Sequence, residues 1–211
     1  MRIPWAPGGP GPDGAAGSDL PDWAAWLAWA AILTPIAVLA HELAHFVAGA
    51  VLGFPDLALH HDSVTHTADE AGFPLWQQGL VDGAGPLLSL LLVALCARAA
   101  SRRGTGPVLL GIALPSGMRT VGLGAAYLLH RLRRPGVSLD LRVDEGGVAH
   151  AAGISPAIVL GAGTLAVLVL WAFLVRGVPG DGRLRRVVSS TAGTALGVLL
   201  YLALLGPLLL P

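Results

Sequence analysis

The chain has 211 residues, of which 54% are hydrophobic and only 12% are charged. A typical soluble domain carries about 25% charged residues, so the composition excludes an ordinary soluble protein and a disordered or nucleic-acid-binding chain. The mean hydropathy of +0.69 instead predicts an all-α integral membrane protein. Because 13 acidic residues balance 13 basic ones, the net charge indicates no partner. Cys96 is the only cysteine, which excludes an internal disulfide.

The first 22 residues hold five Gly and five Pro and contain no apolar run. A signal peptide would need an apolar core of roughly 7–15 residues. We therefore predict a flexible N-terminal tail over residues 1–22, followed by a single polytopic membrane domain over residues 23–211.

Long gaps between ionisable residues mark the candidate membrane spans, because ionisable side chains are costly in hydrocarbon. A spanning helix needs about 20 apolar residues. The sequence predicts five transmembrane helices, at about residues 23–52, 79–100, 106–130, 153–176 and 187–209. The second is short unless the residues up to Asp82 belong to it. The third contains Pro115 and Arg119, so it could be a continuous helix, a broken helix or a re-entrant segment.

In the last predicted span, Gly193 and Gly197 form a pair of small residues one helical turn apart. Such a pair favours close packing of two helices in a membrane. Ordinary use of Gly explains it equally well in a chain that contains 29 of them.

The first predicted span contains the run His41-Glu42-Leu43-Ala44-His45. On a helix, residues four apart lie about 40° apart around the axis and one turn along it, so both imidazoles can reach one Zn²⁺ ion. Glu42 lies beside them and can take a proton from a metal-bound water. We therefore predict His41 and His45 as zinc ligands and Glu42 as the catalytic base. The alternative is a polar seam between helices.

A catalytic zinc site usually takes three protein ligands and leaves one position for water. If the first span ends on side A of the membrane, loops 53–78 and 131–152 also lie on side A. All seven His of the chain then fall on side A or in the adjoining half of the first span. The candidates for the third ligand are the nearby carboxylates and His60, His61, His66, His130 and His150.

The run from Ala40 to His45, followed by Gly53, resembles the site-2 protease family of intramembrane zinc metalloproteases. That family has a second signature, an Ala-Gly-Pro run that opens the next span. Ala84-Gly85-Pro86-Leu87-Leu88-Ser89 looks like this signature, with Ser89 where Asn is common. The resemblance covers about residues 23–177 and implies a minimal member without an inserted recognition domain.

In that family the third zinc ligand is an Asp in a later Asp-Gly motif. Asp144-Glu145-Gly146-Gly147 is the best match, so the resemblance implies Asp144 as the third ligand. The chain contains no Asn and lacks the Asn-Pro-Leu-Asp-Gly pattern of better-known members. Asp140, Glu145 and His150 therefore remain alternatives.

The resemblance implies a zinc-dependent metalloendopeptidase in a bacterial cell membrane that cleaves membrane-spanning or membrane-proximal peptides. Its partners would be a membrane protein or peptide substrate and the lipid bilayer, with no nucleic acid. A membrane-embedded zinc hydrolase of a non-peptide substrate also fits, because the motif specifies water activation and not the bond. A third possibility is a non-catalytic membrane subunit with a structural metal site. The sequence indicates no oligomeric state.

Two further polar features carry open alternatives. Arg119 is expected to pair with Asp82 or Asp144, or to stabilise an oxyanion or orient a ligand carboxylate. The stretch from His60 to Glu70 is interpreted as a solvated loop, a second metal site, a lip for water or an edge strand for substrate. Orientation stays open, because eight Arg on side B against four on side A favour side B as cytoplasmic, whereas the family usually opens its site to the cytosol.

Overall fold

The computed structural model describes residues 21–67, 72–134 and 143–210, so nearly all of the predicted tail lies outside the described residues. The long helices are α1 (Asp22–Leu52), α2 (Leu75–Arg103), α3 (Pro107–Arg133), α5 (Pro156–Gly177) and α6 (Arg183–Leu200). The shorter elements are strands β1 (Ala58–Leu59) and β2 (Val64–Thr65), helix α4 (Asp144–Ala152), the π-helical turn η1 (Tyr201–Leu205) and helix α7 (Gly206–Leu209).

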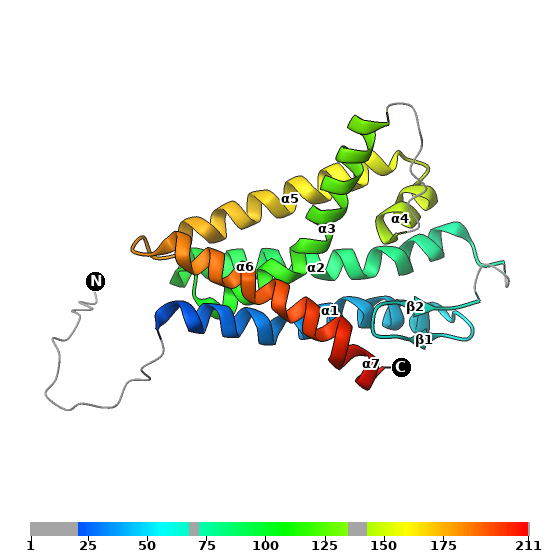
Figure 1. The fold of residues 1–211 in the computed structure, drawn as a ribbon. Coiled ribbons are helices and arrows are strands. Elements are labelled where there is room, and N and C mark those ends of the chain that lie inside the picture. Colours follow the sequence, from blue (N-terminus) through cyan, green and yellow to red (C-terminus); the bar gives the residue numbers. More distant parts are fainter. Residues whose placement is uncertain (1–20, 68–71, 135–142, 211) are drawn as a thin grey trace, which may run out of the picture.

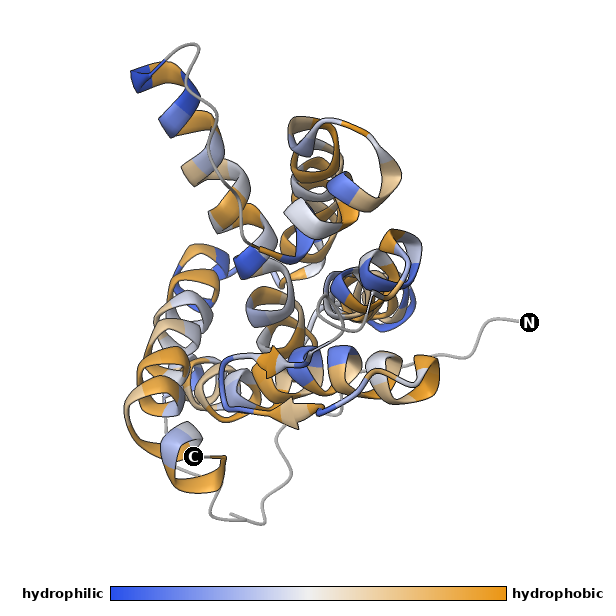
Figure 2. Ribbon diagram, turned by 90° about the vertical axis from the view of Figure 1, so that its right-hand side faces the viewer, coloured by the Kyte–Doolittle hydropathy of each residue, from blue (hydrophilic) through white to orange (hydrophobic). Residues whose placement is uncertain are grey.

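Five helical segments of the described chain are long and apolar enough to cross a membrane. They are α1, α2, α3, α5 and the run from α6 through α7, which confirms the prediction of an all-α, multi-pass membrane protein. Figure 2 shows hydrophobic residues along most of their length and hydrophilic residues at several helix ends. The outward-facing side chains are largely apolar, as expected of a surface that contacts lipid.

Several helix boundaries differ by three or four residues from the predicted spans, and the starts of α2 and α5 are two examples. Helix α2 begins at Leu75, directly after Pro74, so Asp82 lies well inside a helix. Helix α5 begins at Pro156. The residues before it belong to a separate helix, α4, which ends at Ala152 and is capped by Gly153. Apolar runs locate a span, but helical hydrogen bonding continues through polar residues until a proline or glycine ends it.

The third span is a continuous α-helix, so it is neither broken nor re-entrant. Pro115 lies inside it, and Figure 1 shows α3 changing direction near its middle. A proline removes one backbone hydrogen bond and crowds the preceding turn, which bends a helix without ending it when neighbouring helices support it. Arg119 follows one turn after this proline, on the same helix.

The Gly193 and Gly197 pair does pack α6 closely against α1. A Cβ atom at Gly193 would lie 2.2 Å from the Leu27 carbonyl oxygen, and one at Gly197 would lie 2.7 Å from that of Ala31. Only glycine permits such an approach of two backbones. The interpretation as a packing motif is therefore confirmed.

The β1–β2 hairpin, α4 and α7 gather at the end of the molecule where α1 ends (Figure 1). Helix α4 rests on the first half of α2 because the facing residues are small. A Cβ at Gly79 would lie 2.4 Å from the Ala151 side chain, and one at Gly147 would lie 1.8 Å from the Asp82 carboxylate. This close contact carries Asp144, at the start of α4, to the histidines of α1.

Candidate metal centre

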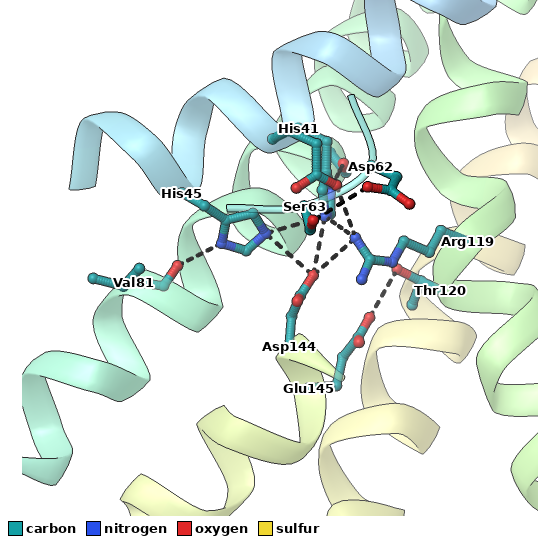
Figure 3. A network of polar contacts seen from close by, with 11 residues as sticks. His41, His45, Asp62, Ser63, Val81, Arg119, Thr120, Asp144 and Glu145 are labelled. Carbon is teal, nitrogen blue, oxygen red and sulfur yellow. Dashed lines mark hydrogen bonds and ion pairs between the residues drawn. The ribbon is translucent and has the colours of Figure 1, made fainter. Parts of the chain in front are cut away.

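Helix α1 presents His41, Glu42 and His45 toward the interior of the helical bundle. Their exposed fractions are 8%, 5% and 5%. The two imidazoles meet edge to face, with ring centroids 5.0 Å apart. Three polar side chains of one short run are thus withdrawn from the lipid-facing surface, and Figure 3 shows the residues that surround them.

Asp144 reaches the two histidines from the first residue of α4. Its Oδ2 atom lies 3.1 Å from the Nε2 atoms of both His41 and His45. The two Nε2 atoms are 3.3 Å apart. One nitrogen from each histidine and one carboxylate oxygen therefore converge, and this group could hold a metal ion.

The hydrogen bond made by Nδ1 of each imidazole determines whether Nε2, which faces the other ligand atoms, carries a proton. His45 Nδ1 lies 2.7 Å from the Val81 carbonyl oxygen, which can only accept, so Nδ1 carries the proton. His41 Nε2 contacts Arg119 Nη1, which can only donate, so in a neutral ring Nδ1 donates to Ser89 Oγ at 2.9 Å. Both rings thereby keep Nε2 unprotonated, which is the state that a metal ligand requires, as in sites where a hydrogen bond orients each ligand.

The residues around this point fit a divalent cation. A Cβ at Gly85 would lie 2.3 Å from His45 Nε2 and 2.6 Å from His41 Nε2, so the glycine keeps open the space that both nitrogens face. Two nitrogens and one carboxylate oxygen form a donor set that Zn²⁺ accepts. His45 Nε2 and Asp144 Oδ2 are both acceptors when the ring is neutral, so a cation or a proton between them would relieve their repulsion.

Arg119 adds positive charge at the edge of the group and pairs with Asp144, one of its two predicted partners. Its Nη1 atom lies 2.9 Å from Asp144 Oδ2 and 3.5 Å from Glu42 Oε1. Burial alone raises the pKa of Asp144, but the contacts with His41 and His45 and the charge of Arg119 hold it well below its usual range. Asp144 is therefore a carboxylate whose charge the Arg119 guanidinium balances.

The other candidates for the third ligand do not join the group. The Glu145 carboxyl turns away to Thr120, with its Oε1 atom 3.5 Å from Oγ1. His150 is exposed near the other end of α4, and Asp140 lies outside the described residues. In the described part of the chain, His41, His45 and Asp144 are the one cluster with metal-binding spacing.

The histidine- and acid-rich loop after α1 covers the group from outside. A cavity of about 240 Å³ separates the two, with Glu42, His45, Arg119 and Asp144 on its inner wall. The loop contributes its outer wall through Asp62, Ser63, Val64 and His66. Because β2 begins at Val64, the hairpin places a short strand directly beside the candidate metal centre.

No family model, no curated protein and no solved structure matches this chain. The resemblance to site-2 proteases therefore stays a prediction that rests on the motifs.

Sequence reasoning did not assign the residues that support the histidines. The Ala-Gly-Pro run contains the signal, because Gly85 and Ser89 are four residues apart and so lie on one face of α2. The Val81 carbonyl lies four residues before Gly85, on that same face, but a backbone acceptor leaves no trace in residue type. It emerges only from the way in which α1 and α2 pack.

Proposed function

We propose that this protein is a zinc-dependent intramembrane metalloprotease that hydrolyses peptide bonds of membrane-spanning or membrane-proximal substrates. The observation that carries the proposal is the convergence of His41 Nε2, His45 Nε2 and Asp144 Oδ2 beside a buried Glu42. The motif resemblance and the five membrane-spanning helices support it independently. His41, His45 and Asp144 would hold the zinc ion.

When bound, zinc would lower the pKa of a coordinated water to about 7 and polarise the peptide carbonyl. Glu42 accepts the proton of the attacking water and then donates it to the leaving amine nitrogen. Its burial among apolar helices keeps the carboxylate from being solvated by bulk water, which strengthens its interaction with the reacting groups. Arg119 orients the Asp144 carboxylate and balances its charge.

The cavity under the hairpin gives this chemistry a place for water and substrate. It touches Glu42, His45 and Asp144 on one side and β2 on the other. A helical substrate hides its amides in hydrogen bonds, so it must unwind before the carbonyl can be attacked. Small or helix-breaking residues in the substrate lower that cost.

The proposal predicts that Glu42→Gln retains zinc and loses cleavage of a tagged single-span substrate in detergent by at least about 100-fold. The amide cannot accept the proton of water, whereas the three ligand atoms are untouched. Metal analysis and cleavage are measured on the same purified protein. Asp22→Asn is the matched control, because it removes a carboxylate from the other end of α1, where Asp22 pairs with Arg186.

Full activity of Glu42→Gln with an active Asp22→Asn control would remove Glu42 from the mechanism. A wild-type protein that binds zinc, leaves all tested single-span peptides intact and alters a lipid would contradict the protease assignment.

A further inference from the structure

A second cavity lies between α2, α3, α4 and α5, and the proposed hydrolysis makes no use of it. Its volume is about 290 Å³, and of its lining residues only Thr120 and Glu145 are polar. Two other lining residues, Leu80 and Leu87, are 52% and 64% exposed. The cavity therefore opens onto the apolar outer surface of α2, which faces lipid in a membrane.

The cavity is elongated rather than round. Its lining residues on α2 run from Gly79 to Leu90, a rise of about 16 Å at 1.5 Å per residue. Those on α5 run alongside, from Val159 to Val167. Gly163, at the middle of the α5 wall, has no side chain to fill the space. A slot of this shape with apolar walls fits a hydrocarbon chain.

A buried carboxyl with one free oxygen lies in the wall of this slot. Glu145 is 4% exposed, and its Oε1 atom receives a long hydrogen bond of 3.5 Å from Thr120. Its Oε2 atom is buried and has no hydrogen-bond partner among the residues that the structure describes. A buried oxygen without a hydrogen-bond partner is unfavourable, so a molecule in the slot that donates a hydrogen bond to it would be stabilised there.

We propose that this slot binds a neutral amphiphile, an apolar chain that carries one hydroxyl group, with the hydroxyl donating to Glu145 Oε2. A hydroxyl group donates one hydrogen bond, which matches the one unpartnered oxygen of Glu145, whereas an ammonium group carries three donors. An anionic group would meet the carboxyl of Glu145 unfavourably. This site goes beyond the proposed proteolysis and does not depend on zinc.

The test compares two photoreactive probes in the purified full-length protein in detergent. One is a long-chain fatty alcohol with a diazirine in its chain, and the other is its methyl ether, which lacks the donor. We expect the alcohol to label slot residues of α2 and α5 with at least about tenfold higher apparent affinity than the ether, the size of one hydrogen bond to a carboxyl group. Equal labelling by both probes, or labels that map elsewhere, overturns the proposal.

Two variants and one control locate the binding within the slot. Gly163→Leu fills the slot and abolishes labelling, whereas Gly161→Leu, two residues earlier on α5 with open space around it, leaves labelling unchanged. Glu145→Leu keeps the volume and removes the acceptor, so labelling by the alcohol falls to that of the ether. The proposal is overturned if Gly163→Leu binds the alcohol normally but no longer cleaves peptide, which would assign the slot to a peptide side chain.

Discussion

At the scale of single residues, Gly85 controls the space in which the metal would bind. The two Nε2 atoms are held in place from behind, by Val81 and Ser89 of the same helix. They cannot retreat without losing these hydrogen bonds. Gly85 is therefore needed because α2 comes so close to the histidines that no side chain fits there. Its backbone conformation is helical and does not itself require glycine.

We expect Gly85→Ala to lower zinc affinity by about 10- to 100-fold, the range for changes that disturb the orientation of metal ligands. The new methyl group would lie 2.3 Å from His45 Nε2, so the imidazole must move away from the ligand position. Competition with a fluorescent zinc chelator measures the effect. Gly161→Ala, where a Cβ would meet no atom within 4 Å, should bind zinc as the wild type does. Equal affinities for the two variants would show that Gly85 does not limit the site.

The residue types alone predict three of the four residues proposed as ligands and base. His41, Glu42 and His45 can be predicted because a helix places residues four apart on one face, whatever the rest of the fold does. Asp144 cannot be derived in this way, since about 100 residues separate it from the histidines. Nothing local distinguishes it from Glu145, its neighbour, whose carboxyl turns to Thr120 instead.

At the scale of helices, the contact between α1 and α6 depends on two glycines rather than on large apolar side chains. This contact supports the half of α1 that precedes the histidines. Sequence predicts which segments are helices, because apolar length decides that, and the small-residue pair correctly indicated a close contact. It did not predict that α3 stays helical through Pro115, because the neighbouring helices decide whether a proline bends a helix or ends it.

We expect Gly193→Ala to destabilise the protein by about 1–3 kcal/mol, as is usual when a methyl group is forced into a packed contact. The Cβ would lie 2.2 Å from the Leu27 carbonyl oxygen, so the two helices must separate. Thermal unfolding in detergent measures the change. Gly122→Ala on α3, with open space around it, should be neutral or slightly stabilising, because alanine favours a helix by about 1 kcal/mol over glycine. An unfolding temperature for Gly193→Ala equal to that of Gly122→Ala would contradict the packing role.

At the scale of the whole molecule, the packing of five membrane-spanning helices brings the short helix α4 to the histidines of α1. Helix α4 lies against the small residues of α2, and this contact helps to carry Asp144 to α1. Charge scarcity in the sequence predicts the membrane protein, and the spacing of the spans places the histidine-rich loops on one side. The register in which α4 lies on α2 depends on side-chain volumes at every contact, and no sequence pattern encodes it.

The most direct measurement is a structure of the zinc-loaded protein with anomalous scattering recorded at the zinc edge. We predict one strong peak per chain within about 2.2 Å of His41 Nε2, His45 Nε2 and an Asp144 carboxylate oxygen. A peak held by other residues, or no peak at this point after zinc loading, would contradict the assignment of these three residues as a metal centre.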